Sequence, residues 1–421
     1  MVVDFEEYAL EDLGKIITGK TPSTKIPEYF GHGFPFFTPR DMDGKRFITT
    51  TERYLTQKGV DSVKSSFLPP ESILVSCIGS DMGKVTINKM AGVSNQQINS
   101  IILDQEKFNL LYVYYNLSAR QKELKNLGAS GSALPILNKG DFSKVQIFLP
   151  PLATQERIAD ILGTLDDKIE LNRQMNHTLE AMARAIFKSW FVDFDPVYAK
   201  MEGRDYPLPA EVLDLFPAEL VESELGLIPK GWEVGKLKDI IDFNPHYRLS
   251  KGTEATYLEM KVLPEKGFFP TDWRKREFTS GTKFTNGDTL LARITPCLEN
   301  GKTAYINFLE PNEIAWGSTE YIVMRTKKDL PNTYSYLLAR NGSFRKSAIK
   351  SMTGSSGRQR VQRKTLEELP TVIAPNKIYG KFDKIIKSMF EKMTANNLEN
   401  ITLAEIRDTL LPKLMSGKII L

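Results

Sequence analysis

Cysteine and histidine are scarce in this sequence of 421 residues. The two cysteines are Cys77 and Cys297, and the three histidines are His32, His177 and His246. Two cysteines cannot build a disulfide framework or a four-thiolate zinc cluster. With so few metal-binding side chains in the chain, we expect no structural metal.

Long hydrophobic runs are also missing. No segment of about 18 apolar residues occurs, and the N-terminus lacks the basic stretch followed by an apolar core that marks an export signal. We therefore expect a cytoplasmic protein without a membrane partner. Hydrophobic residues still make up 41% of the chain, which is enough to fill the cores of the two or three domains expected at this length.

Neither sign of charge dominates, since 56 Lys and Arg residues face 52 Asp and Glu residues. The formal net charge of +4 is too small to indicate nucleic-acid binding. Its distribution is uneven, because residues 232–375 carry 23 basic and 16 acidic side chains, whereas residues 191–231 carry 3 and 9. This favours a protein that meets phosphate on one side and a protein partner on another, although chance unevenness gives the same pattern.

An apolar seam organises residues 151–190. Its positions are separated alternately by four and three residues, which is typical of a coiled-coil helix rather than of a helix lying on a globular core. Pro151 excludes an earlier helical start, Thr154 is a candidate N-cap and Pro196 ends the helix. The seam consists of Ile158, Leu162, Leu165, Ile169, Asn172, Asn176, Leu179, Ala183, Ile186 and Trp190.

A second seam follows 224 residues later. Both seams carry a pair of asparagines at midlength, Asn172 with Asn176 and Asn396 with Asn400. A buried asparagine is best satisfied by another asparagine, so we expect the two helices to pair with each other. The second seam consists of Phe382, Ile386, Met389, Met393, Asn396, Asn400, Leu403, Arg407, Leu410 and Leu414.

The repeat extends beyond the helices. At the same offset Leu13 matches Leu237, and residues 142–151 match residues 366–375. The sequence predicts an α+β fold, with two mixed α/β domains in tandem separated by two long helices. Since a duplicated unit that closes on itself has a two-fold axis, we expect an antiparallel intramolecular coiled coil. The predicted parts are a first domain at 1–150, a central helix at 151–195, a connector at 196–231, a second domain at 232–375 and a C-terminal helix at 376–421.

Local patterns predict the elements of the first domain. β-rich apolar runs predict strands at 73–78, 85–88, 98–103 and 145–149. A helix is expected at 108–124, followed by a Gly/Ser loop at 128–132.

Two stretches imitate enzyme motifs. Residues 14–21 match the phosphate-loop pattern, but that loop requires a helix starting at Lys20, which Pro22, Pro27 and nearby glycines exclude. Residues 243–247, Phe-Asn-Pro-His-Tyr, are similar to an amino-methyltransferase motif. No glycine-rich loop for a methyl donor precedes them. We therefore expect no catalytic residues and no cofactor in this chain.

Polar loops supply the candidate DNA contacts. Residues 354–364 are rich in Gly, Ser, Arg, Gln and Lys, and the Gly/Ser loop at 128–132 holds the equivalent place in the first domain. Arg and Gln pair with guanine and adenine edges, whereas Lys and Ser suit phosphates. A solvated basic loop is the alternative. The candidates are Arg40, Lys84, Gln96, Gln97, Ser130, Arg293, Lys302, Arg358, Gln359 and Arg360.

Over essentially its whole length the sequence resembles the specificity subunits of type I restriction-modification systems. The matching segments are PPLATQERI at 150–158, WFVDFDP at 190–196, GLIPKGW at 226–232, NGDTLLARITPCLENGKT at 286–303, GSTE at 317–320 and LLPKLMSG at 410–417. Residues 19–23 also resemble the opening of that family's recognition domains. One departure is that the Pro-Lys-Gly-Trp entry at 229–232 has no full counterpart before Tyr8.

The resemblance implies a non-catalytic subunit that recognises double-stranded DNA. Each globular domain would read one half of a split, asymmetric site, and the paired helices would fix the unread spacer. A helix of about 35 residues is about 50 Å long, the length of about fifteen base pairs. The implied partners are two methyltransferase subunits, which bind S-adenosylmethionine, and restriction subunits, which use ATP and Mg. The rival hypothesis is a scaffold whose two domains bind proteins rather than DNA.

Overall fold

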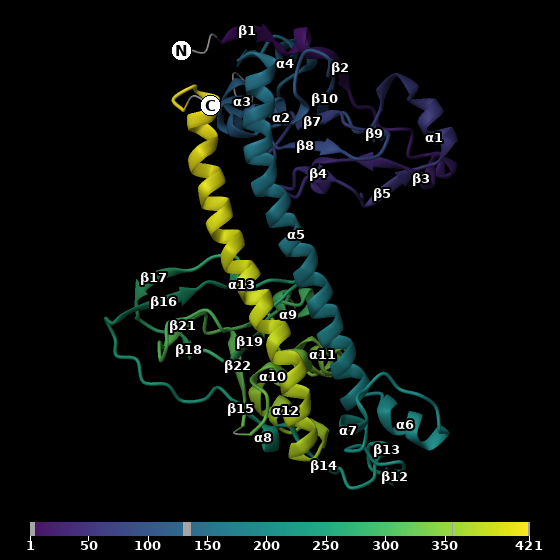
Figure 1. Ribbon diagram of the computed structural model, residues 1–421, viewed down its shortest axis with the longest axis vertical. Helices are drawn as coiled ribbons and strands as arrows, with labels where there is room; N and C mark the ends of the chain where they lie inside the picture. The colour runs from purple at the N-terminus through teal and green to yellow at the C-terminus, as the bar shows by residue number, and fades with distance from the viewer. Residues whose placement is uncertain (1–4, 129–135, 328, 356, 420–421) are drawn as a thin grey trace. The chain divides into compact units, whose positions relative to one another are not determined.

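The computed structural model describes residues 5–128, 136–327, 329–355 and 357–419. The chain forms two compact units, one comprising Met1–Ile169 with Ile401–Leu421 and the other comprising Glu170–Asn400. Each unit contains one globular domain and a segment of each of two long helices (Figure 1).

The long helices are α5 (Leu152–Phe191) and α13 (Asn376–Met415), each of 40 residues. Helix α5 begins two residues before the predicted cap, Thr154. Its first bonds run to the Pro151 carbonyl, which accepts from the backbone N–H groups of Thr154 (2.8 Å) and Gln155 (3.1 Å). The Gln155 side chain donates to the Pro150 carbonyl (2.9 Å), so this buried amide holds the start of the helix.

Within each unit the two helices pair in antiparallel fashion, as the two-fold argument predicts. In the first unit Asp166 of α5 pairs with Arg407 of α13. In the second unit Asn172 meets Asn400, and Asn176, further along α5, meets Asn396, which is earlier in α13. All twenty seam positions are buried or half-buried. The 3–4 spacing therefore identifies the face of each helix that is turned away from solvent.

The described residues of the first domain form three sheets. A two-stranded sheet joins β1 (Glu6–Ala9) to β11 (Gln146–Leu149). A five-stranded sheet has the order β2 (Gly14–Thr18), β10 (Ile98–Leu103), β7 (Ile73–Ser76), β8 (Val85–Asn88) and β4 (Phe47–Ile48). A four-stranded sheet has the order β5 (Arg53–Leu55), β3 (Phe30–Phe37), β9 (Gly92–Ser94) and β6 (Phe67–Leu68).

The second domain repeats this plan. A two-stranded sheet joins β14 (Glu233–Lys236) to β23 (Pro370–Ile373). One four-stranded sheet has the order β15 (Ile241–Phe243), β22 (Tyr321–Thr326), β19 (Thr289–Ala292) and β20 (Thr303–Tyr305). The other has the order β17 (Arg274–Glu277), β16 (Glu254–Leu258), β21 (Ala315–Gly317) and β18 (Thr282–Phe284).

The two domains differ by one edge strand. Strand order and pairing correspond sheet by sheet, and the parallel pairing of β3 with β9 recurs as that of β16 with β21. Only β4, which pairs in parallel with β8, has no counterpart among the described residues of the second domain. The repeat is therefore one of topology, and the first domain has an addition at one sheet edge.

The remaining helices connect or cover these sheets. In the first domain they are α1 (Gln57–Ser62), α2 (Leu110–Ala119), α3 (Gln121–Gly128) and α4 (Lys139–Ser143). The single helix predicted at 108–124 is thus two helices, α2 and α3, divided at Arg120. The Arg120 side chain forms an ion pair with Glu123 in the first turn of α3. In the second domain the helices are α8 (Leu237–Ile240), α9 (Cys297–Asn300), α10 (Asn332–Arg340), α11 (Gly342–Lys350) and α12 (Arg363–Glu367).

The segment between α5 and the second domain is ordered and irregular. It contains α6 (Asp195–Glu202), α7 (Ala210–Leu213) and the hairpin β12 (Leu220–Ser223) to β13 (Gly226–Pro229). Its Phe216 packs edge-to-face on Trp190 of α5, with ring centroids 5.2 Å apart, and Phe194 packs on Trp232 at 5.5 Å. Aromatic packing therefore holds this segment against the second unit.

The two enzyme-like stretches have structural roles. Gly14–Thr18 is strand β2, and residues 19–23 form no helix. In the second stretch Asn244 has a left-handed backbone (φ 52°), and its side chain accepts from the Val323 N–H (2.8 Å). Across the described ranges, no helix is long and apolar enough to cross a membrane.

Candidate nucleic-acid interface

A polar cleft of about 450 Å³ opens on the first domain. Of the predicted contacts, it contains the exposed Arg40 and the half-buried Gln97. Both donors and acceptors face this cleft, which suits the edges of bases and sugar-phosphate groups. Its lining residues are Thr38, Pro39, Arg40, Asp41, Glu52, Arg53, Ile78, Gly79, Ser80, Asp81, Asn95 and Gln97.

Arg53 is a cleft residue that the sequence did not indicate. Its guanidinium lies 4.4 Å from the centre of the Phe30 ring and 5.4 Å from that of Phe36. These rings belong to the neighbouring strand β3, which pairs with β5 in antiparallel register. Only the strand pairing brings Arg53 to the rings, so no local pattern could have revealed it.

The turn before β10 presents three amide side chains. Asn95 donates to the Gln97 side-chain oxygen (2.9 Å) and accepts from the Gln97 backbone N–H (3.1 Å), which fixes the amide of Gln97. Gln96 is exposed and accepts from the Thr21 hydroxyl (2.6 Å). Gln97 thus keeps an amide at the cleft with both donor and acceptor character.

Two other predicted contacts of this domain lie elsewhere. Lys84 pairs with Asp81 (2.8 Å) and borders a different hollow, of about 320 Å³, together with Asp166 and Arg407. Ser130 lies outside the residues that the structure describes.

The second domain places its predicted contacts around two antiparallel bridges, Ile294 with Arg360 and Thr353 with Arg360. Arg360 faces Glu320 through Nε (2.9 Å to Oε1) and Nη2 (2.6 Å to Oε1). Hydrogen bonding to Glu320 raises the pKa of the Arg360 guanidinium. Arg293 donates from Nη2 to the Gln362 side chain (3.1 Å), and its buried Nε has no partner among the described groups.

The other predicted residues of this domain differ in whether their side chains are exposed or engaged with other groups. Lys302 donates to the carbonyls of Met260 (3.1 Å) and Lys261 (3.2 Å), so its ammonium group is engaged with backbone. Arg358 is exposed, and Gln359 is half-buried with its carbonyl accepting from the Thr295 N–H (3.0 Å). Arg358 is therefore the most accessible cation of the predicted set in this loop.

Backbone hydrogen bonds show that the two candidate sites occupy equivalent positions in the two domains. We call this repeated set of hydrogen bonds the backbone frame. The Cys77 N–H donates to the Gln97 carbonyl (2.8 Å), as the Arg293 N–H donates to that of Glu320 (3.0 Å). The Leu137 and Val361 N–H groups donate to the carbonyls of Cys77 and Arg293, each at 2.9 Å. The bridges Ile78 with Ile136 and Ile294 with Arg360 complete the match. Gln97 and Ile136 of the first domain thus correspond to Glu320 and Arg360 of the second.

The four predicted helix-pairing residues lie together in the second unit. Asn396 donates to the Asn176 side-chain oxygen (2.8 Å), and Asn172 donates to that of Asn400 (3.0 Å). Asn172 and Asn396 are also fully buried. Within the described ranges, no group of three or more His, Cys, Asp or Glu side chains is arranged to hold a metal ion.

The sequence matches one protein family twice. The profile described as type I restriction modification DNA specificity domain covers residues 2–181 and 229–407. The MjaIX specificity subunit of Methanocaldococcus jannaschii is 26% identical over 99% of this chain and 94% of its own length. The HindI specificity subunit of Haemophilus influenzae is 24% identical over 99% and 100%.

Solved structures give the same result for the fold. The crystal structure of a type I restriction-modification S subunit from M. genitalium matches 98% of this chain and 96% of its own, with a TM-score of 0.55 and 17% identity. Both the tandem domains and the long helices belong to that shared fold.

Proposed function

The chain belongs to the family defined by the type I restriction modification DNA specificity domain, and we propose that it is the sequence-reading subunit of such a system. Each globular domain reads one half of a bipartite, asymmetric site in double-stranded DNA. The paired helices fix the spacer between the halves and dock methyltransferase subunits.

One observation carries this proposal: the same backbone frame presents different side chains in the two domains. At the positions where the first domain has Gln97 and Ile136, the second has Glu320 paired with Arg360. A duplicated frame with unlike side chains is what an asymmetric site requires, because each half is then read by its own set of hydrogen-bonding groups.

The chemistry of modification belongs to the partners in this proposal. The chain itself is non-catalytic and needs no cofactor. Two methyltransferase subunits bind S-adenosylmethionine and act on the DNA that this chain selects. Restriction subunits, where present, bring ATP and Mg. The support is the family of the relatives, which are named as specificity subunits of type I restriction enzymes.

The decisive experiment maps modified adenines in genomic DNA. Cells that express the chain with its methyltransferase subunit are compared with cells that lack only this chain. We expect a split motif that appears only when the chain is present. If no such motif appears although the methyltransferase is made and folded, the proposal fails and the scaffold hypothesis gains support.

A further inference from the structure

The first domain is attached to the helices in two adjoining parts. The first is apolar, because Ile158 and Leu162 of α5 and Leu414 of α13 belong to the core of the domain itself. The second lies further along α5 and is ionic. It consists of Arg46, Tyr115, Asp166, Asp167 and Arg407, which we call the ionic clamp.

Arg46 joins the domain to α5. It lies immediately before the edge strand β4, and its side chain is only 8% exposed. Its Nη1 donates to the Tyr115 hydroxyl (3.1 Å) and to the Gly163 carbonyl (3.2 Å), and its Nη2 pairs with Asp167.

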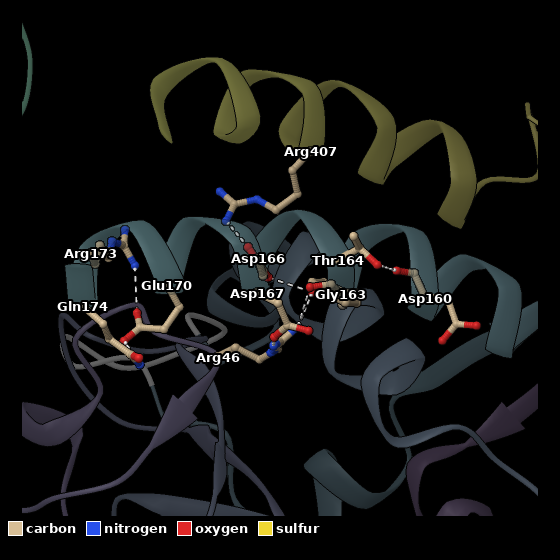
Figure 2. Close-up of polar contacts among 11 residues, drawn as sticks. Arg46, Asp160, Gly163, Thr164, Asp166, Asp167, Glu170, Arg173, Gln174 and Arg407 are labelled. Carbon is tan, nitrogen blue, oxygen red and sulfur yellow. Dashed lines mark hydrogen bonds and ion pairs between the residues drawn. The ribbon is translucent and has the colours of Figure 1, made fainter. Parts of the chain in front are cut away.

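Asp166 joins α5 to both the domain and α13. Its carboxylate accepts from the Tyr115 hydroxyl (2.7 Å) and from Arg407 Nη1 (2.7 Å), and the side chain is 12% exposed. Figure 2 shows Arg407 reaching Asp166 from one side of α5, while Arg46 approaches the same turn from the other. Domain, α5 and α13 therefore meet in one network.

The clamp combines charged groups with burial, so it stabilises one position of the domain against the helices. Burial alone would lower the pKa of the Arg407 guanidinium, but the hydrogen bond and charge of Asp166 raise it overall. Burial, followed by the charge of Asp166, raises the pKa of the Tyr115 hydroxyl. The clamp thus keeps its charges and its Tyr115 proton at neutral pH, and a displaced domain would leave buried charges without partners.

The second domain has a related polar attachment. The Tyr336 hydroxyl donates to Glu180 of α5 (2.6 Å), and Arg340 Nε donates to the same hydroxyl (3.1 Å). No equivalent of β4 is found among its described residues. Within the described ranges, the contact that Arg46 makes beside an edge strand is therefore specific to the first domain.

An attachment that extends along a helix fixes an angle, whereas a contact at one turn leaves a pivot. The two parts together extend along α5 from Ile158 to Asp167, over which the helix advances about 14 Å. We propose that the ionic clamp fixes the tilt of the first domain on its helices, and thereby determines which spacer length the protein accepts. Arg46 is the positioning residue. This proposal rests on the proposed function, because it concerns the distance between two half-sites.

The test uses the full chain assembled with its methyltransferase. Duplexes carry the wild-type motif with its native spacer, or with a spacer shorter or longer by one base pair. For Arg46→Met we expect discrimination between native and altered spacers to fall by about tenfold, equal to about 1.4 kcal/mol. The bases of both half-sites stay the same, and Arg46→Lys restores part of the discrimination.

The matched control lies outside the long helices. Arg204 forms an exposed ion pair with Glu202 in the segment that follows α5, so Arg204→Met removes a guanidinium without touching the clamp. It should keep wild-type spacer discrimination. If Arg46→Met does not assemble, Asp167→Ala, at a position whose side chain is 72% exposed, removes one clamp contact and should lower discrimination about twofold to threefold.

The outcomes are separable. Unchanged spacer discrimination in an assembled clamp variant, with or without a loss of thermal stability, overturns the proposal and leaves the proposed function standing. A wild-type chain that directs no split motif overturns the proposed function, and this proposal with it.

Discussion

Gln97 and Glu320 hold the same place in the two domains, yet their side chains differ in what they can bind. The Gln97 amide offers a donor and an acceptor at a cleft, the combination that pairs with adenine, whereas a carboxylate accepts only and suits the cytosine amino group. We predict that Gln97→Glu weakens methylation of the native site by about tenfold, since a bidentate base contact is worth about 1–3 kcal/mol. The modified-base map should change in one half of the motif only.

The control for this substitution is Gln105→Glu. Gln97 precedes β10 and Gln105 follows it, so the two amides lie at opposite ends of one strand. Gln105 is exposed and has Glu71 as its neighbour (3.4 Å). An equal effect of both substitutions would assign the change to net charge rather than to base recognition.

Asp288 shows that part of the distinctive loop at 286–303 is structural. Its side chain is fully buried and accepts from Arg325 Nε (2.7 Å) and the Tyr247 hydroxyl (3.0 Å). Burial raises the pKa of Asp288, and the charge of Arg325 opposes this rise. We predict that Arg325→Met lowers the free energy of unfolding of the second domain by about 3 kcal/mol, because it leaves a buried carboxylate unpaired.

The pH dependence of the stability of Arg325→Met follows from the direction in which the pKa of Asp288 changes. Without Arg325 the pKa of Asp288 rises further, so protonation relieves the unpaired charge. The stability deficit of Arg325→Met should therefore be largest near pH 7 and shrink as the pH falls toward 4. Thermal denaturation of both proteins at several pH values measures this. Adding Asp288→Asn should recover much of the loss at pH 7, and a deficit that is independent of pH would contradict the argument.

At the scale of single elements, the asparagine pairs explain how the helices keep their register. Inside the seam, Asn396 Nδ2 donates to the Asn176 side-chain oxygen, and Asn176 Nδ2 donates to the Met393 carbonyl. We predict that Asn396→Ala destabilises the helix pair by about 1–3 kcal/mol, because the Asn176 side-chain oxygen loses its donor. Replacing both residues with Leu should cost much less, since two apolar groups leave nothing unpaired. Thermal melting of the three variants decides this, and equal losses in the single and double variants would exclude the pairing as the cause.

The helices were predictable because their signal is local and repeated. The 3–4 spacing and the asparagine pairs can be read directly from neighbouring positions. Strands Val85–Asn88 and Ile98–Leu103 have the bounds that their apolar runs predicted, and β7 ends at Ser76, two residues earlier than expected.

The candidate interface was less accessible to sequence reasoning. Arg53 reaches its cleft only because β5 pairs with β3, and Arg46 reaches α5 across 121 positions to Asp167. Lys302 was predicted as a DNA contact from its loop, and the structure shows its ammonium group on backbone carbonyls. The direction of a side chain depends on long-range pairing, which residue spacing does not contain.

At the scale of the whole molecule, the distribution of charge predicts how DNA affinity depends on salt. For a protein that neutralises several phosphates, the logarithm of the DNA affinity falls linearly with the logarithm of the salt concentration, with a slope of about −0.9 for each phosphate contacted. The second domain carries 23 basic against 16 acidic side chains, and Arg358 is an exposed cation of its loop. We predict a steep slope for the assembled complex. If Arg358 contacts a phosphate, the magnitude of the slope should decrease by about one in Arg358→Ala.

The same measurement separates sequence reading from charge. If Arg358 contacts a base, Arg358→Ala should relax the preference at one position of one half-site, with little change in salt slope. Arg204→Ala, in the segment that follows α5, removes an equal charge away from the loops and the long helices and should leave both quantities unchanged. Affinities measured from about 50 to 200 mM salt on matched and mismatched duplexes provide both readouts. A complex without DNA affinity at low salt would instead favour a protein-binding scaffold.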